Sequence, residues 1–223
     1  NGWAVGTNGT IVKTSDGGIR WEVQKSNVTA GLQSVYAVND SIVYCVGRQA
    51  TILKTTNGGS SWGRLISGFS VFLNGTAFST EKNGWAVGNG GIVMATTNGG
   101  DTWFTQFPLV EDNINLRAIH VFSNGQAWVI GDKGTIRVTT NGGANWAIQQ
   151  SPVQTDLYAV HFTDNLHGWA CGEKGTILAT TNGADWQDIS LPIEENLSAI
   201  RFFNNNNGIV AGKNGEVYVT NDG

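Results

Sequence analysis

The stretch "TTNGGDTW", from Thr96 to Trp103, occurs in near copies along the whole chain. Three further copies read "TSDGGIRW", "TTNGGSSW" and "TTNGGANW", and a shorter one reads "TTNGADW". Each copy ends on a Trp, and the copies begin at Thr14, Thr55, Thr139 and Thr180. A polar octapeptide that returns at regular intervals indicates a corner that the fold needs many times.

A second motif repeats with the same period. The motif "WAVG" and its variants close on a Gly, and successive glycines are 41, 41, 43, 41 and 40 residues apart. These glycines are Gly6, Gly47, Gly88, Gly131, Gly172 and Gly212. Six copies predict a repeat fold, with repeats at approximately 1–25, 26–66, 67–107, 108–149, 150–189 and 190–223.

Each complete repeat reads as four short β-strands, which we call strands A to D. In the repeat that starts near Asn115, strand A is "NLRAIHVF", strand B "GQAWVIG", strand C "TIRVTT" and strand D "WAIQQ". Short strands bounded by Gly and Asn are typical of β structure, and no window has helical periodicity. Four antiparallel strands in every ~40 to 45 residues describe one blade of a β-propeller. The sequence therefore predicts an all-β propeller of four-stranded blades.

The two ends of the chain bear on the domain prediction. The first repeat lacks strand A and the last lacks strand D, so 22 strands are expected. Because native proteins avoid exposed strand edges, we expect residues 1–223 to be a single propeller domain and a fragment of a longer chain. The intact ring is expected to have six or seven blades.

The residues of the octapeptide have turn-building roles. In "TTNGGDTW", Asn98 is expected to accept a hydrogen bond from a backbone N–H two residues on, and Gly99 and Gly100 allow positive φ. Trp103 is expected to begin strand D and bury its ring between blades. Asp16 gives way to Asn in the next four copies, so charge is dispensable there. The predicted structural turn residues are Asp16, Trp21, Asn57, Trp62, Asn98, Trp103, Asn141, Trp146, Asn182 and Trp186.

Composition excludes several classes of protein. The 223-residue chain has a net charge of -4, and its thirteen Lys and Arg are scattered, so we expect no nucleic-acid partner. No apolar run approaches the ~18 residues that span a bilayer, so no transmembrane segment is expected. Cys45 and Cys171 occupy adjacent columns of strand B, which point to opposite faces, so we expect no disulfide between them.

The combined pattern of "NGWAVG", "GTI" and the octapeptide resembles the photosystem II stability/assembly factor-like propellers, a branch of the Asp-box (bacterial neuraminidase) repeat proteins. The resemblance covers essentially the whole chain, and Asn1–Trp21 and His167–Trp186 carry it best. It implies a non-catalytic scaffold or assembly-factor module that binds another protein. The photosynthetic members are chaperones that bind a membrane-protein precursor, and a basic surface is implicated. This chain is acidic and has only six Arg, which departs from that pattern.

Similar propellers also occur in exported, often multi-domain bacterial proteins, and that group is the better match. The resemblance therefore implies an extracellular, cell-surface or periplasmic location. A true photosynthetic homologue would instead lie in a compartment like the thylakoid lumen.

The alternative function is a carbohydrate-active propeller, either a glycoside hydrolase, a sialidase-like enzyme or a lectin-like glycan binder. Sialidases need three convergent Arg and a Tyr paired with Glu. Here Arg117, Arg201 and Tyr158 fall in strand A, with no third strand-A Arg and no Glu beside Tyr158. Endoglucanases need two carboxylates across a cleft, and no acidic residue stands in a recognisable motif. The acidic loop residues are Glu111, Asp112, Asp156, Glu194 and Glu195. We therefore predict no catalytic residues.

Metal binding has weak support. His120 and His161 occupy the same strand-A column in neighbouring repeats, whereas His167 lies in a different turn. Structural zinc normally takes four ligands. We predict no metal and no cofactor.

Strands A begin, and B–C turns fall, on one rim of a propeller, and loops on a rigid scaffold are where binding residues usually lie. The candidate binding residues on this rim are Arg48, Arg117, Lys133, Tyr158 and Lys174. Another protein is the expected partner, and a glycan is the alternative.

Overall fold

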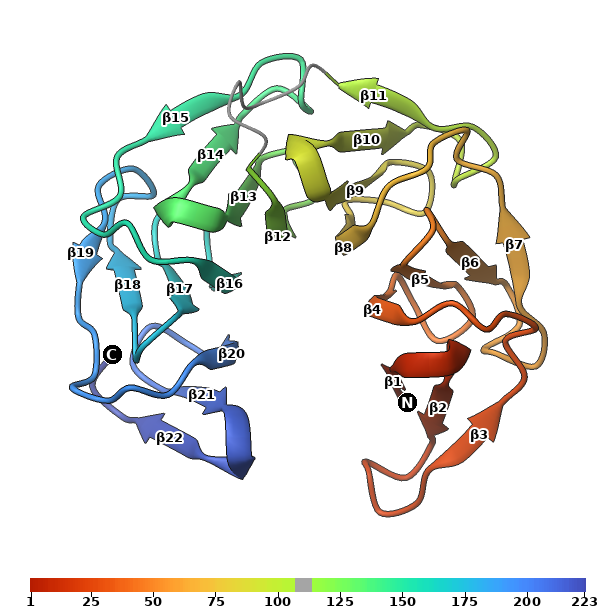
Figure 1. Cartoon of the computed structure of the whole chain (residues 1–223), viewed down its shortest axis with the longest axis horizontal. Helices are drawn as coiled ribbons and strands as arrows, with labels where there is room; N and C mark the ends of the chain where they lie inside the picture. The colour runs from red at the N-terminus through yellow and green to blue at the C-terminus, as the bar shows by residue number, and fades with distance from the viewer. Residues whose placement is uncertain (107–113) are drawn as a thin grey trace. The chain divides into compact units, whose positions relative to one another are not determined.

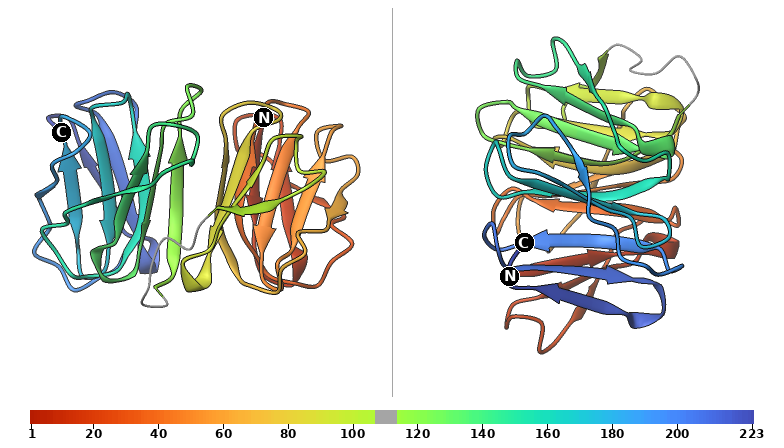
Figure 2. Two further views of the ribbon diagram at one scale, coloured as in Figure 1. Left: turned by 90° about the horizontal axis from the view of Figure 1, so that it is seen from above. Right: turned by 90° about the vertical axis from the view of Figure 1, so that its left-hand side faces the viewer.

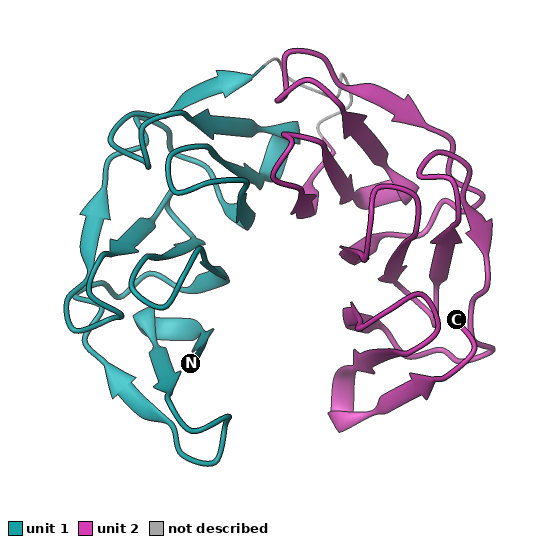
Figure 3. Cartoon of the chain, turned by 180° about the vertical axis from the view of Figure 1, so that it is seen from behind, with its two compact units in different colours: residues 1–110 teal, residues 111–223 magenta. Residues whose placement is uncertain are grey.

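The computed structural model describes residues 1–106 and 114–223, which form 22 β-strands (Figure 1). The chain divides into an N-terminal unit, residues 1–110, and a C-terminal unit, residues 111–223 (Figure 3). The strands of the N-terminal unit are β1 (Gly2–Val5), β2 (Ile11–Thr14), β3 (Glu22–Gln24), β4 (Leu32–Ala37), β5 (Val43–Gly47), β6 (Ile52–Thr55), β7 (Gly63–Leu65), β8 (Leu73–Phe78), β9 (Gly84–Gly88), β10 (Val93–Thr96) and β11 (Phe104–Gln106). Those of the C-terminal unit are β12 (Leu116–Val121), β13 (Ala127–Gly131), β14 (Ile136–Thr139), β15 (Ala147–Gln149), β16 (Leu157–Phe162), β17 (Gly168–Gly172), β18 (Ile177–Thr180), β19 (Gln187–Asp188), β20 (Leu197–Phe202), β21 (Gly208–Gly212) and β22 (Val217–Thr220).

Each unit contains three antiparallel sheets whose strands follow chain order. The N-terminal unit has sheets β1–β3, β4–β7 and β8–β11, and the C-terminal unit has sheets β12–β15, β16–β19 and β20–β22. Within each unit the strands lie side by side, with their turns gathered at the two ends (Figure 2). These sheets are propeller blades, so the predicted all-β propeller is confirmed, including the two three-stranded blades. The assignment of residues 1–223 to a single domain stays a prediction.

In the blades that have a strand A, the glycine that closes the "WAVG" motif sits where two backbones approach closely. A Cβ on Gly88 would overlap the carbonyl oxygen of Phe72, well inside the 3.0 Å that real Cβ atoms keep. Gly47, Gly131 and Gly172 meet the corresponding carbonyl in their own blades in the same way. The same carbonyl accepts a hydrogen bond from the residue after the glycine, as Asn89 N–H to Phe72 O at 2.9 Å shows. Only Gly allows this approach of strand B to strand A.

The B–C turns that follow these glycines place two consecutive residues in the left-handed region, the pattern of a tight type I′ hairpin. Four of the turns are recorded as one-turn 3-10 segments, η1 (Thr7–Gly9), η2 (Asn89–Gly91), η3 (Asp132–Gly134) and η4 (Lys213–Gly215). The second left-handed residue is Gly in five turns. In the remaining turn it is Ala50, with φ 50°.

The octapeptide forms the C–D turn of its blade. Gly100 N–H donates to Thr96 Oγ1 at 2.9 Å, and the Thr96 hydroxyl donates to Asn98 Oδ1 at 2.9 Å. The predicted hydrogen bond from two residues on is wrong for the four longer copies. There the acceptor reaches the N–H four residues on, as in Thr102 N–H to Asn98 Oδ1 at 3.0 Å. The shorter fifth copy alone has the predicted bond, because its turn is one residue tighter.

The octapeptide also links neighbouring blades of one unit. The carbonyl of its first glycine accepts hydrogen bonds from the preceding blade, from Tyr44 Oη and Lys54 Nζ to Gly99 in the N-terminal unit. In the C-terminal unit, Trp128 Nε1 and Gln149 Nε2 donate to Gly183. The turn therefore links neighbouring blades by hydrogen bonds, besides connecting strands C and D.

The aromatic residues repeat one packing arrangement. Phe78 stacks on Tyr44 of the preceding blade with ring centroids 3.9 Å apart, and Trp103 packs edge-on against Phe78 at 6.2 Å. Phe162, Trp128 and Trp186 repeat this arrangement in the C-terminal unit. Among the octapeptide tryptophans, Trp62, Trp103 and Trp186 are buried, and Trp146 is half-buried. Trp21, in contrast, is 47% exposed.

Both cysteines are buried free thiols, Cys45 in β5 and Cys171 in β17. Burial raises the pKa of both, that of Cys171 to about 12, so neither is a reactive thiolate at neutral pH. Within the described ranges, none of the helical segments has the length and apolar character needed to cross a bilayer.

We predict that Gly88→Ala destabilises the protein by roughly 2 kcal/mol or more, because overpacking at a fixed backbone contact cannot be relieved by a side-chain rotation. Gly63→Ala is the matched control, since its Cβ would meet only Lys54 O at an ordinary 3.8 Å. Urea unfolding of the two variants measures the difference. Equal losses would contradict the assignment of the close approach.

We predict that Asn98→Asp changes the free energy of unfolding by less than about 0.5 kcal/mol, whereas Asn98→Ala costs ~1 to 2 kcal/mol. The alanine removes the acceptor for the Thr102 N–H and the Thr96 hydroxyl, and the aspartate keeps it. Asp16 already makes the equivalent hydrogen bonds. The one from the Arg20 N–H lowers the pKa of Asp16 most, and the one from the Thr14 hydroxyl lowers it further. Thermal or urea melts that ranked the two variants in the opposite order would exclude the turn role.

Candidate functional site

Strand A carries a β-bulge at the same place in every blade that has this strand. The register with strand B shifts after the buried Leu that begins the strand, as between Leu116 and Ala118 in β12. The extra residues are Gln33, Asn74, Arg117, Tyr158 and Ser198. A bulge re-aims a side chain and is frequent beside functional sites.

We define the B–C rim as these bulge residues, the residues just before strands A, and the B–C turns. All five candidate binding residues lie on it. Arg117 and Tyr158 are bulge residues, Arg48 is the first residue of its turn, and Lys133 and Lys174 are left-handed turn residues. Sequence patterning located the turns, but it could not show the bulges, because a bulge is a mismatch between two strands rather than a property of one.

The two lysines contribute backbone groups to the fold as well as charge to the surface. Lys133 has φ 55° and donates its N–H to Asp156 Oδ1 of the next blade at 3.0 Å. Lys174 has φ 50° and donates its N–H to Asn196 Oδ1 at 3.2 Å. Both side chains are exposed. The acidic or amide residue just before strand A thus fastens the preceding B–C turn.

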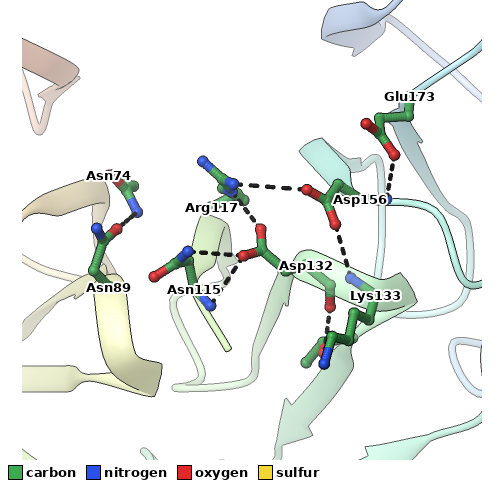
Figure 4. A network of polar contacts seen from close by, with 9 residues as sticks. Asn74, Asn89, Asn115, Arg117, Asp132, Lys133, Asp156 and Glu173 are labelled. Carbon is green, nitrogen blue, oxygen red and sulfur yellow. Dashed lines mark hydrogen bonds and ion pairs between the residues drawn. The ribbon is translucent and has the colours of Figure 1, made fainter. Parts of the chain in front are cut away.

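Arg117 is the centre of a polar network in the C-terminal unit (Figure 4). Its Nε donates to Asp132 Oδ1 at 2.6 Å, and its Nη2 lies 3.7 Å from Asp156 Oδ2. Asp132 also accepts a hydrogen bond from Asn115 Nδ2 at 2.8 Å. Arg117 is therefore already held by two carboxylates of its own chain, which the sequence did not reveal.

Tyr158 lies beside this network, with Arg117 Cζ 5.8 Å from its ring centroid. Burial raises the pKa of Tyr158, the carboxylates of Glu173 and Asp156 raise it further, and Arg117 opposes them. Glu173, which acts electrostatically on Tyr158, comes from the B–C turn of the same blade rather than from a neighbouring position along the chain. A nucleophilic tyrosine needs activation, whereas this environment disfavours the phenolate.

The rim of the N-terminal unit differs in chemistry. Arg48 Cζ lies 5.7 Å from the ring centroid of Phe72, the residue before β8. Asn74 Nδ2 donates to Asn89 Oδ1 at 2.9 Å, which joins a bulge to its B–C turn (Figure 4). Sequence reasoning singled out Arg48 but missed Phe72. The position of Phe72 in the repeat could have pointed to it, because the same column holds Gly31, Asn115, Asp156 and Asn196 in the other repeats.

Of the remaining acidic candidates, the structure describes Asp156, Glu194 and Glu195. Glu111 and Asp112 lie outside the described residues. Asp156 belongs to the Arg117 network, and Glu194 is exposed. Glu195 lies before β20, where its carbonyl accepts a hydrogen bond from Gly175 N–H.

His120 and His161 lie together in the C-terminal unit, away from the B–C rim. Their ring centroids are 5.3 Å apart, and His161 Nδ1 accepts a hydrogen bond from Phe202 N–H at 3.3 Å. The pKa of His120 is lowered to about 3, mainly by burial and to a smaller extent by the charges of His161 and Arg201. Burial and then Arg201 lower that of His161 to about 4. In the part of the chain that the structure describes, no three His, Cys, Asp or Glu side chains gather as metal ligands.

One family model matches the sequence from end to end. It is described as "Photosynthesis system II assembly factor YCF48" and matches residues 1–68, 68–150 and 144–223. No curated protein matches the sequence.

Solved structures with a similar fold include two of YCF48. YCF48 from Cyanidioschyzon merolae is 19% identical, with a TM-score of 0.75, over 99% of this chain and 79% of that one. YCF48 bound to D1 peptide is 23% identical, with a TM-score of 0.55, over 91% and 81% of the two chains. The GH74 enzyme of Niastella koreensis is 18% identical, with a TM-score of 0.80, but only 42% of its chain is covered against 99% of this one. At these identities the likenesses show the fold alone.

We predict that the free energy of unfolding falls as the pH drops from 6.5 to 5, by up to about 1.4 kcal/mol per pH unit from His120. Its folded pKa lies below the ordinary 6.5, so the unfolded state takes up the proton first. The stability is present above pH 6.5 and is lost as the pH falls. His120→Phe keeps an aromatic ring against Phe122 and Phe162 but cannot titrate. Urea melts should show a shallower pH dependence for this variant, and parallel curves would contradict the buried neutral state.

Proposed function

Because this chain belongs to the family of the photosynthesis system II assembly factor YCF48, we propose that it binds a segment of another protein through the B–C rim. It acts as a non-catalytic interaction module of the assembly-factor type. The observation that carries this proposal is the bulge at the same position of every described strand A, which presents a different side chain in each blade.

Framework and rim positions differ in how they vary between repeats. The closing glycine and the octapeptide threonine and tryptophan recur because each has one structural role. The bulge column instead reads Gln, Asn, Arg, Tyr and Ser. Within each unit, a rigid set of blades that carries varied polar and aromatic residues at its B–C ends suits recognition of an extended, irregular partner.

A peptide is the partner class that the comparisons favour. One similar solved structure is of YCF48 bound to D1 peptide, and we extend that class of partner, a peptide segment, to this chain. The family context favours a compartment in which photosystem components are assembled. Extracellular, cell-surface and periplasmic locations are the alternatives for an exported homologue.

A glycan or glycoside substrate has less support. The carboxylates gathered on the C-terminal rim, Asp132, Asp156 and Glu173, accept hydrogen bonds from their own chain. They hold Arg117 and three backbone N–H groups, those of Asn115, Lys133 and Asp156, rather than stand free across a cleft.

The test is selection of a random dodecapeptide phage library on the whole chain. We expect enriched peptides that bind at least tenfold more weakly to a Gln33→Trp/Ser198→Trp variant, because both positions are exposed bulge residues. The control variant Ile19→Trp/Ala144→Trp carries the same change at exposed octapeptide positions and should bind normally. If the enriched peptides bound the Gln33→Trp/Ser198→Trp variant as tightly as the wild type, the proposal would be overturned. Hydrolysis of aryl glycosides by the wild type would favour the carbohydrate alternative.

A further inference from the structure

The rim of the N-terminal unit exposes apolar side chains in one short segment. Between β7 and β8, Ile66 is 86% exposed, Phe69 36% and Phe72 46%. Phe72 is also part of an open groove of about 440 Å³, lined by Gln49, Ser70, Val71, Phe72, Asn89 and Gly90. Exposed aromatic and aliphatic residues beside a concave surface are typical of a site that takes an apolar side chain of a partner.

Arg48 supplies the charge at this groove. Its guanidinium lies over the Phe72 ring, and its side chain passes Gly31, where a Cβ would stand 3.6 Å from Cδ. Stacking on an aromatic face leaves the donors at the edge of the guanidinium plane directed outwards. None of the ion pairs among the described residues involves Arg48.

Among residues 1–106, none of the acidic residues lies on the B–C rim that carries this cation. The N-terminal unit has five acidic residues within 1–106, and all lie at the A–B turns, in the octapeptides or at the start of strand D. They are Asp16, Glu22, Asp40, Glu81 and Asp101. Antiparallel topology places those positions at the end of the blades opposite the B–C rim. In the C-terminal unit, by contrast, Arg117 is held by Asp132 and Asp156.

The turn that carries Arg48 is also the most strained B–C turn. Gln49 and Ala50 both have positive φ, at 55° and 50°, without a glycine at either position. A left-handed non-Gly residue costs roughly 1 to 2 kcal/mol, and such residues concentrate at functional sites. Ala50 N–H donates to Val71 O at 2.6 Å, which holds the turn against the segment that presents Phe72.

We infer that this groove, with Arg48 at its edge, takes a partner segment in which a carboxylate stands next to an apolar side chain. The apolar side chain packs beside Phe72 and Phe69, and the Arg48 guanidinium pairs with the carboxylate. The inference rests on the proposed function, since it assigns the chemistry of the peptide that the rim binds. Of the two rim arginines, it assigns carboxylate recognition to Arg48, because Arg117 is already held by Asp132 and Asp156.

The test uses a fluorescein-labelled, C-terminally blocked octapeptide that holds one Phe, two Leu and one Asp among Gly and Ser, and a twin with Asn in place of Asp. Fluorescence anisotropy should show the Asp peptide binding at least tenfold more tightly to the wild-type chain. Arg48→Gln should remove that preference, and Phe72→Ser should weaken both peptides equally. Arg20→Gln, an exposed arginine on an octapeptide, is the matched control and should keep the preference.

Several outcomes would overturn the inference. One is that Arg48→Gln still binds the Asp peptide more tightly than the Asn peptide by the same factor. A second is that a peptide with Lys in place of Asp binds the wild-type chain more tightly than the Asn peptide by that factor. A third is that neither the Asp nor the Asn peptide binds at about 1 mM. Salt should weaken the Asp peptide in the wild type but not in Arg48→Gln. If the library selection yields rim-dependent peptides without carboxylates, this inference fails while the proposed function stands. If no selected peptide depends on the rim, the proposed function itself fails.

Discussion

The close approach of two backbones at the glycine that ends strand B is the constraint on which the B–C rim depends in the blades that have a strand A. At Gly88 there is room for no side chain, because the carbonyl of Phe72 occupies the space where a Cβ would stand. The carbonyl accepts the next N–H, which draws the start of strand A against the end of strand B. With both strands pinned there, the extra residue of strand A bulges outwards and the B–C turn closes in the left-handed region. The geometry of the candidate binding rim follows from this contact.

The opposite end of the blade has a different task. There the octapeptide turn ties its own corner through Thr and Asn side chains and offers a glycine carbonyl to the preceding blade of the same unit. Different residues donate to that carbonyl, Tyr44 and Lys54 in one case and Trp128 and Gln149 in another. Because the acceptor is a backbone carbonyl, this contact between blades forms with different donor side chains. Separating this structural end from the B–C rim leaves the rim free to vary, which is the condition for a binding surface on a repeat protein.

Prediction from the sequence succeeded where a local backbone conformation requires one residue type. The closing glycines, the octapeptides and the alternating strands each repeat, so the blade and its strand number could be derived from spacing. It was wrong about the partner of Asn98, since the N–H that its side chain reaches depends on the path of the whole turn. The sequence also did not reveal that Trp21 is exposed, although Trp62, Trp103 and Trp186 at the same position of the octapeptide are buried.

The sequence by itself determined the architecture, because glycine, Asx and β-branched positions constrain the backbone locally and recur every ~41 residues. It also determined which turns could carry function. Only the tertiary structure decided what the side chains on those turns do. Arg48 and Arg117 are both candidate binding residues in the sequence, yet one lies over Phe72 and the other is neutralised by Asp132 and Asp156. The reason is physical, since the availability of a charge depends on neighbours brought together by strand pairing and blade packing, and these neighbours are distant along the chain.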